Sequence, residues 1–445
     1  MNKDQKKSEN STESDFELEF SESNGVNSQE GEKQFVVCAY HFVRRIPRKI
    51  ARRVQKLLNP FIFTKFYPWY YKKCASTPLK KGGVLFVEPM YFELSNNLQL
   101  LYKELDENYD YNVRALILGH ARTRWLKKIF ENISVIKEVA EADYIFISNT
   151  SSLINVLPLR KETQLVQTWH GCGAFKKFGF SIGGGAGAND NYELFKLHSN
   201  YSHVFVSGTE AVEPYVDAMR LQDHREIVHP DGVSRTDVFF DEANKAEAFE
   251  KLYSLYPEAK GKKIILWAPT YRGAVRKARS PKGFKLDQLY EGVNSDEYVV
   301  FIKRHPLVKK RAYIPEEVPE NFVFDVTKTL SIDDLMFVSD ICISDYSSLV
   351  FEYSLFNRPM IFFTPDLEDY YDRRGFYYPF KDFVCGPICY DIEQVIDAIN
   401  SIDSFDLERV AAFKEKFMNG CDGHATQRIL NRVFGEENLK SHRQQ

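Results

Sequence analysis

Four short polar segments, each directly after an apolar run, carry the residues that could do chemistry. The first is Thr168–Gly171, in which His170 could accept a proton near neutral pH and Gly171 would let a ligand approach the backbone. Lys176 and Lys177 follow at the predicted start of a helix. A histidine at a strand end can also be purely structural, and this segment alone does not separate the two interpretations.

The second and third segments supply cations. Thr270 and Arg272 follow an apolar run, and a guanidinium suits a phosphate as well as a surface carboxylate. Lys303, Arg304 and His305 follow the next apolar run. Three potential cations at one strand end would focus a positive field on an anion.

The fourth segment offers hydroxyls and a carboxylate. Asp345, Ser347 and Ser348 follow an apolar run and precede a predicted helix, so the serines could bind a phosphate or simply cap the helix. Glu352 lies one turn after Ser348 and could accept a hydrogen bond from a polyol hydroxyl or form a helix-surface pair. Together the four segments suit a nucleotide diphosphate, and we expect no metal or other cofactor to be required.

The elements that must position these residues alternate between strand and helix. Ser95 is predicted to cap the helix over 96–108, and a Gly-rich stretch over 179–190 lacks phosphate-loop spacing and is expected to be a mobile loop. Buried strands are predicted over 83–88, 114–118, 143–148, 164–168 and 203–207, then over 262–269, 298–306, 321–325, 340–348 and 358–363. Two such series predict an α/β fold with two doubly wound, Rossmann-like domains facing a cleft.

The composition excludes several classes of protein. The 445-residue chain has a net charge of −3, which argues against a nucleic-acid binder, and no apolar run reaches the ~18 residues of a membrane-spanning helix. Its seven cysteines include no CxxC pair, which argues against a zinc site or a disulfide framework. The N-terminus lacks the apolar core of a secretory signal.

The near-neutral sum conceals a local asymmetry. Residues 1–33 are polar and acidic and are predicted to be disordered. Residues 34–81 combine a basic amphipathic helix with clustered aromatics, which is typical of an interfacial membrane segment. The alternative is a solvated helix that packs on a neighbouring domain through its aromatics. The predicted membrane-binding residues are Arg44, Arg45, Arg48, Lys49, Arg52, Arg53 and Trp69.

The motifs and their order resemble a known family. QTWHGCGAFKKFGF, GVSRTDVFF, ILWAPTYRG, FIKRHPLV, SDICISDYSSLVFEYSLF and CDGHATQRIL are similar to segments of bacterial CDP-glycerol glycerophosphotransferases, the teichoic-acid primases and polymerases of GT-B architecture. The resemblance covers residues 83–434 and includes Arg235 and Asp237. Three positions depart from the family pattern: Cys172 stands for Thr, Ser234 for Pro, and Glu352 for Asp.

The resemblance implies a reaction and roles for residues. A polyol phosphate, most simply glycerol phosphate from CDP-glycerol, would pass to a hydroxyl acceptor with release of CMP. His170 would act as general base, and His305 would hold the pyrophosphate. The residues expected to bind substrate are Gly171, Thr270, Arg272, Lys303, Arg235, Asp237, Asp345, Ser347, Ser348 and Glu352.

The resemblance also implies a location and a division of the chain. We expect a peripheral enzyme at the cytoplasmic face of the bacterial membrane, with a polyprenyl-diphosphate-linked or glycolipid acceptor, in teichoic-acid-like or capsular polymer synthesis. The acceptor domain is predicted over 82–242, the CDP-polyol donor domain over 243–434 and a tail over 435–445. The alternatives are a CDP-ribitol enzyme, a GT-B glycosyltransferase that uses a CMP-sugar, and an inactive adaptor that keeps the fold.

Overall fold

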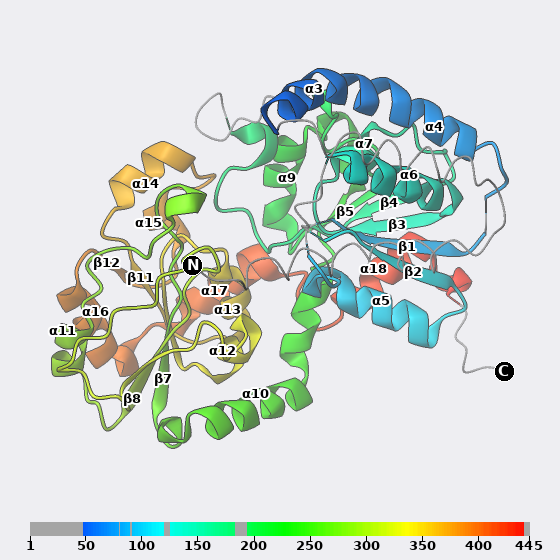
Figure 1. Ribbon diagram of the computed structural model, residues 1–445. Coiled ribbons are helices and arrows are strands. Elements are labelled where there is room, and N and C mark those ends of the chain that lie inside the picture. The colour runs from blue at the N-terminus through cyan, green and yellow to red at the C-terminus, as the bar shows by residue number, and fades with distance from the viewer. Residues whose placement is uncertain (1–47, 80, 90, 120–124, 183–193, 440–445) are drawn as a thin grey trace, which may run out of the picture. The chain divides into compact units, whose positions relative to one another are not determined.

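The computed structural model describes residues 48–79, 81–89, 91–119, 125–182 and 194–439, and the chain divides into two compact units, 1–60 and 61–445 (Figure 1). The predicted disordered tail, Arg44, Arg45 and most of the Gly-rich stretch lie outside the described residues. Each unit is described by itself below.

The first sheet contains six parallel strands in the order β2-β1-β3-β4-β5-β6. They are β1 (Gly83–Glu88), β2 (Asn112–Ile117), β3 (Tyr144–Ile147), β4 (Gln164–Gln167), β5 (His203–Phe205) and β6 (Val228–His229). Every residue of β1 is buried, as expected for a parallel strand that is covered on both faces.

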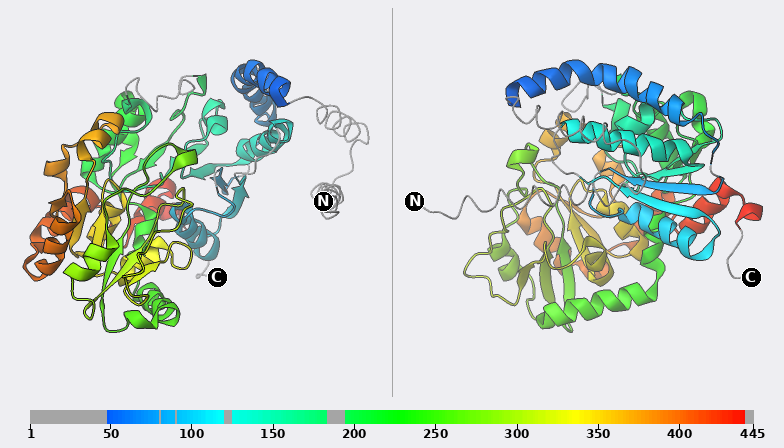
Figure 2. Two further views of the ribbon diagram at one scale, coloured as in Figure 1. Left: turned by 60° about the vertical axis from the view of Figure 1, so that its left-hand side comes forward. Right: turned by 45° about the vertical axis from the view of Figure 1, so that its right-hand side comes forward.

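Helices cover both faces of this sheet (Figure 2). One face packs against α4 (Tyr67–Cys74), α6 (Trp125–Glu141), α7 (Ser152–Val156) and α9 (Val212–Met219). The other packs against α5 (Asn96–Asn108) and α18 (Ala425–Phe434). Ser95 occupies the N-cap position of α5, as predicted. Its hydroxyl makes no hydrogen bond to the helix, however, because it bonds to Ser148 Oγ at 2.9 Å instead.

The second sheet also contains six parallel strands, in the order β12-β11-β10-β7-β8-β9. They are β7 (Lys263–Trp267), β8 (Tyr298–Ile302), β9 (Val323–Asp325), β10 (Ile341–Ser344), β11 (Met360–Phe363) and β12 (Ile388–Cys389). The two doubly wound sheets predicted from the sequence are therefore present. The pattern missed β6 and β12, since a two-residue strand is too short to show a hydrophobic period.

The faces of the second sheet are covered by two groups of helices. One group comprises α10 (Glu242–Leu255), α12 (Ile332–Val338), α13 (Leu349–Tyr353), α15 (Phe380–Phe383) and α17 (Leu407–Met418). The other comprises α11 (Leu286–Gly292) and α16 (Ile392–Asn400), and α14 (Leu367–Arg374) follows β11. Toward the C-terminus the chain continues through α16 and α17 to α18.

The last helix of the chain belongs to the core of the first sheet. Phe434 of α18 is buried and contacts Tyr144, at 4.3 Å between ring centroids, and Phe146. The linear domain boundaries predicted above did not include this return of the chain. The boundaries themselves remain predictions.

Two structural settings divide the predicted membrane segment. The helix α3 (Arg48–Phe61) is followed in the chain by the π-helix η2 (Ile62–Phe66) and by α4. Tyr67 and Tyr71 are fully buried in the first-sheet core. For these two aromatics the structure agrees with the alternative interpretation, in which the aromatics pack on a domain. Trp69 stays 58% exposed.

Candidate active site

His170 is presented by a turn with an unusual backbone. Trp169 has φ +55°, a left-handed conformation that bulky residues rarely adopt. Its backbone N–H donates to Gln167 Oε1 at 2.8 Å, and its ring lies 4.4 Å from the His170 ring, centroid to centroid. Backbone strain of this kind persists only where surrounding contacts enforce it, and it clusters at functional sites.

The hydrogen bond made by His170 fixes its tautomer. Nδ1 lies 3.3 Å from the backbone carbonyl oxygen of Ser148, and because a carbonyl can only accept, Nδ1 carries the proton. Nε2 is left with the lone pair that a general base needs. The ring keeps solvent access, yet burial lowers the pKa of His170 from 6.5, while the Ser148 carbonyl and the charge of Glu88 oppose this shift.

His305 is held in the opposite tautomer. Its Nδ1 accepts a hydrogen bond from the backbone N–H of Leu307 at 3.2 Å, so the proton of the neutral ring lies on Nε2. Burial and the charge of Lys176 lower its pKa from 6.5, and Asp345 opposes them. A neutral His305 therefore offers an N–H donor to an anion.

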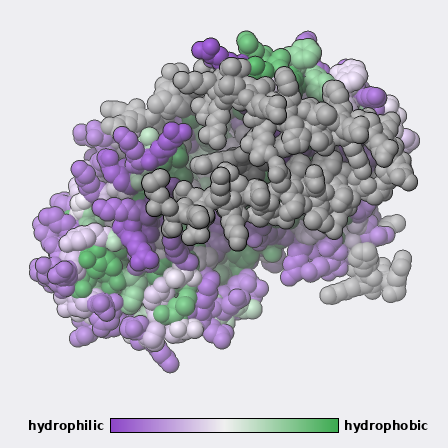
Figure 3. All heavy atoms as spheres, in the orientation of Figure 1, coloured by the Kyte–Doolittle hydropathy of each residue, from purple (hydrophilic) through white to green (hydrophobic). Residues whose placement is uncertain are grey.

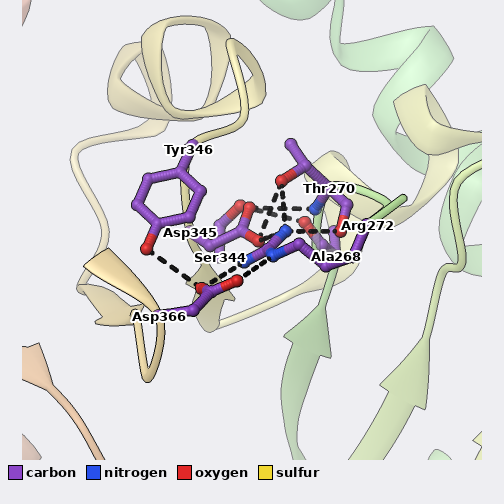
Figure 4. Close-up of polar contacts among 7 residues, drawn as sticks. All are labelled: Ala268, Thr270, Arg272, Ser344, Asp345, Tyr346 and Asp366. Atoms are coloured by element: carbon purple, nitrogen blue, oxygen red, sulfur yellow. Dashed lines mark hydrogen bonds and ion pairs between the residues drawn. The ribbon is translucent and has the colours of Figure 1, made fainter. Parts of the chain in front are cut away.

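Arg272 is clamped between two carboxylates (Figure 4). Its Nε and one terminal nitrogen donate to Asp366 at 2.5 and 2.9 Å. The other terminal nitrogen lies 2.9 Å from Asp345 Oδ2 and donates to the carbonyl of Thr270 at 2.9 Å. The rings of Tyr346 and Tyr370 lie 5.0 and 5.1 Å from the guanidinium carbon.

This clamp ties together the chain beyond three strands of the second sheet. Thr270 follows β7, Asp345 follows β10 and Asp366 follows β11. Asp345 also accepts from the N–H and hydroxyl of Thr270, both at 2.9 Å. Burial alone would lower the pKa of Arg272, but Asp366 and Asp345 outweigh burial and raise it, so the guanidinium stays charged. Its donors serve this internal cluster, and the predicted contact of Arg272 with a phosphate remains a prediction.

Lys303 and Arg304 are likewise engaged by the protein. Lys303 Nζ donates to the carbonyls of Thr327 and Leu330. Arg304 is buried, pairs with Asp325 at 2.8 Å and also donates to backbone carbonyls. Of the three potential cations at this strand end, His305 is the one whose donor, Nε2–H, has no acceptor within the described part of the chain.

The two serines lie where the sequence predicted, at the start of α13. Ser348 is the N-cap residue and is exposed, and its hydroxyl does not cap the helix. Ser347 Oγ accepts from the backbone N–H of Leu349 at 3.3 Å. Both hydroxyls can still donate to an anion, because a hydroxyl that accepts one bond keeps its own hydrogen.

Arg235 and Glu352 face each other in a buried ion pair. Arg235 Nε lies 3.2 Å from Glu352 Oε1, and Asp333 accepts from the same guanidinium at 2.6 Å. Burial raises the pKa of Glu352, and the charge of Arg235 opposes this. Cys172 Sγ lies 3.9 Å from Glu352 Oε1. This pairing joins the regions of the two sheets, and the predicted contact of Glu352 with a donor polyol remains a prediction.

Asp237 caps the last helix. Its carboxylate accepts from the N–H groups of Ala425 and Thr426 at 3.0 and 2.7 Å, in the first turn of α18. Ser234 Oγ lies 2.8 Å from Thr426 Oγ1. The segment with Arg235 and Asp237 thus holds the returning helix, and the structure offers a packing role for both residues beside the predicted substrate contact.

The chain after His170 is built into the core of the second-sheet region. A Cβ at Gly173 (φ +61°) would lie 2.3 Å from the Phe351 ring, whereas one at Gly171 would meet no atom within 4 Å. Phe175 stacks on Phe376 and Phe383, with centroids 4.2 and 4.0 Å away. Packing therefore demands glycine at 173 but leaves the space around Gly171 open for a ligand.

Lys176 is a candidate missed among the predicted site residues. The segment that carries it is extended, not the start of a helix as predicted, and it forms an antiparallel bridge with Phe376. Lys176 Nζ lies 5.4 Å from the Tyr370 ring centroid, and its charge lowers the pKa of His305. Its place after the His170 segment was visible in the sequence, but the approach to His305 depends on the fold.

Within the described ranges, no group of three or more His, Cys, Asp or Glu side chains is arranged to hold a metal ion. The described helices also include none that combines the length and apolar character needed to cross a bilayer.

Replacing Arg272 by Ala should destabilise the fold by about 3–5 kcal/mol, because Asp345 would be left buried without its cation. Urea unfolding followed by intrinsic fluorescence would measure this. Arg276→Ala is the matched control, since Arg276 is exposed and its replacement should change the free energy of unfolding by less than about 0.5 kcal/mol. Equal unfolding midpoints for the two variants would contradict the clamp.

Comparison with known proteins agrees with the predicted family. The family model described as CDP-glycerol:poly(glycerophosphate) glycerophosphotransferase matches residues 70–435. A teichoic acid poly(ribitol-phosphate) polymerase of Bacillus spizizenii is 35% identical over 93% of this chain, which spans 66% of that polymerase. A teichoic acid ribitol-phosphate primase of the same organism is 34% identical over 80% of this chain and 92% of the primase.

A solved structure supports the architecture. The wall teichoic acid polymerase TagF superposes with a TM-score of 0.65 at 21% identity, over 89% of this chain and all of that chain. At this identity the likeness establishes the fold, which confirms the predicted GT-B class. The family match confirms the predicted class of enzyme, a phosphotransferase of teichoic-acid synthesis. The chain belongs to the CDP-glycerol:poly(glycerophosphate) glycerophosphotransferase family.

Proposed function

We propose that this enzyme transfers a polyol phosphate from a CDP-polyol to a hydroxyl of a lipid-linked or glycan acceptor and releases CMP. The observation that carries the proposal is the pair of opposite tautomers. His170 presents an unprotonated Nε2, and His305 presents a protonated one. One ring is suited to accept a proton and the other to donate a hydrogen bond to a phosphate.

In the proposed reaction the acceptor oxygen attacks the phosphorus that bears the polyol. A new O–P bond forms, the bond from this phosphorus to the CMP oxygen breaks, and the hydroxyl proton passes to Nε2 of His170. His305 Nε2–H, with Ser347 and Ser348, would stabilise the charge that develops on the phosphates. Lys176, whose charge acts on His305, would add a positive charge near these donors. Such a transfer depends chiefly on positioning and charge stabilisation.

Glycerol and ribitol are both candidates for the polyol of the donor. Relatives named for ribitol phosphate are 33–35% identical to this chain, and those named for glycerol phosphate are 27–31% identical. One solved TagF structure was soaked with CDPG. We therefore propose CDP-ribitol beside the CDP-glycerol that the motifs first implied.

A donor panel tests the proposed reaction directly. With a lipid-linked acceptor, CMP should be released from CDP-glycerol or CDP-ribitol but not from CMP-sugars, and the mass of the product should rise by one or more polyol-phosphate units. Release of CMP only from a CMP-sugar would show a glycosyltransferase instead. Release from no donor, by a protein that is folded, would favour the adaptor.

Glutamine substitutions should separate the roles of the two histidines, since the glutamine side-chain amide can donate like Nε2–H but cannot accept a proton as a base. His170→Gln and His170→Ala should both lose roughly 10²–10⁴-fold in kcat. His305→Gln should retain more activity than His305→Ala. His224→Gln is the control, because this side chain is 70% exposed.

The pH profile supplies a second readout. A base must be neutral, and burial lowers the pKa of His170 below 6.5, so kcat/KM should fall with decreasing pH only below that value. The His305 variants should keep this acidic limb. Equal losses in His305→Gln and His305→Ala, or an active His170→Gln enzyme, would contradict the assignment.

We also propose that α3 docks on an anionic membrane surface. Its Val54, Leu57, Leu58 and Phe61 recur at helical spacing and are 36%, 78%, 42% and 61% exposed. Arg53 and Lys56 are exposed on the same helix. Figure 3 shows apolar surface beside hydrophilic surface on the helix that Figure 1 labels α3. This combination is typical of a helix that lies in a membrane interface.

The double variant Leu57→Ser, Phe61→Ser should reduce co-sedimentation with vesicles that contain anionic lipid, because it removes the two most exposed apolar anchors of α3. Arg53→Glu with Lys56→Glu should do the same more strongly at low salt, at ~1 kcal/mol per charge near the surface. Leu407→Ser, at 40% exposure, is the control. Point variants spare Tyr67 and Tyr71, which a deletion of residues 34–81 would remove from the core. Unchanged binding by both double variants would exclude this docking mode.

A further inference from the structure

A buried carboxylate, that of Glu88, lies close enough to His170 for its charge to act on the ring. Glu88 is the last residue of β1 and is fully buried. The parallel register pairs Val87 with Ile147, so Glu88 and Ser148 leave their strands side by side. Charged side chains are rarely buried completely unless they are paired or hydrogen-bonded.

Ser148 connects this carboxylate to His170. Its hydroxyl donates toward Glu88 Oε2 across 3.5 Å, a long hydrogen bond, and Ser95 Oγ lies 2.9 Å from the same hydroxyl. The backbone carbonyl of Ser148 accepts from His170 Nδ1. One residue therefore contacts both the carboxylate and the ring.

We propose that Glu88 is a positioning residue, which stabilises the positively charged form of His170 that arises when the acceptor hydroxyl gives up its proton. This inference rests on the proposed function. The proton moves from the acceptor oxygen to Nε2 while Nδ1 keeps its own, so the ring becomes a cation. The negative charge of Glu88 lowers the free energy of that cation, while the backbone carbonyl of Ser148 holds the tautomer that accepts the proton.

The other titratable groups near the ring act on its neighbours. His198 and Tyr215 contact Trp169, and the hydroxyl of Tyr215 donates to the Gly171 carbonyl at 3.1 Å. Glu88 is the charged group that raises the pKa of His170, against the opposing effect of burial. Removal of its charge must therefore make His170 a weaker base.

The test is an NMR titration of the full chain with ¹³C-labelled histidine, in which His170→Ala assigns the His170 signal. Glu88→Gln should lower the His170 pKa and leave those of the other histidines in place. Glu88→Asp keeps the charge but shortens the side chain by one methylene, so it should lower the His170 pKa by less than Glu88→Gln does. This variant also tests the proposal if Glu88→Gln fails to fold. Glu93→Gln is the matched control, an exposed acid in the segment that follows β1. A His170 pKa that is equal in wild type and both Glu88 variants would overturn the proposal.

Kinetics supply the second arm. Glu88→Gln should lower kcat roughly tenfold, well below the 10²–10⁴-fold effect of a general base, with the KM for the donor unchanged and the acidic limb moved to lower pH. In a His170→Ala background it should have no further effect. A purely structural role would instead lower kcat in both backgrounds and leave the limb in place. The titration needs no turnover, so it decides on Glu88 even if no CDP-polyol is used.

Discussion

The packing of the chain after His170 into the core of the second-sheet region is the constraint on which the candidate site depends. Gly173 lies so close to the Phe351 ring that a side chain there would overlap it, and Phe175 is sandwiched between two phenylalanines. Close-packed cores allow little movement. His170, in the first-sheet region, is thereby placed with reference to the region that carries His305.

Buried charge explains why several of the predicted cations pair within the protein. A guanidinium or ammonium group removed from water requires partners, and Arg272, Arg304, Arg235 and Lys303 all find theirs within the protein. These pairs brace the ends of the strands.

The tautomers of the two histidines follow from the backbone rather than from the rings. A carbonyl oxygen opposite Nδ1 leaves the lone pair of the neutral His170 ring on Nε2, and an amide N–H opposite Nδ1 leaves the proton of the neutral His305 ring on Nε2. Neither partner is encoded by its side chain, since both are main-chain atoms. Substitution of Ser148 or Leu307 would thus leave these two hydrogen bonds in place if the backbone kept its path.

The sequence by itself determined the strand and helix order, the family and the two histidines, because these depend on local hydrophobic period and on motif identity. It also placed Ser347 and Ser348 at the start of α13. Only the tertiary structure decided that Arg272 faces two carboxylates, that Asp237 caps α18, and that Tyr67 and Tyr71 belong to a core. The partners in these contacts are separated by 73 to 188 residues or lie on different elements. A local sequence pattern cannot predict which distant group will neutralise a buried charge or cover a buried ring.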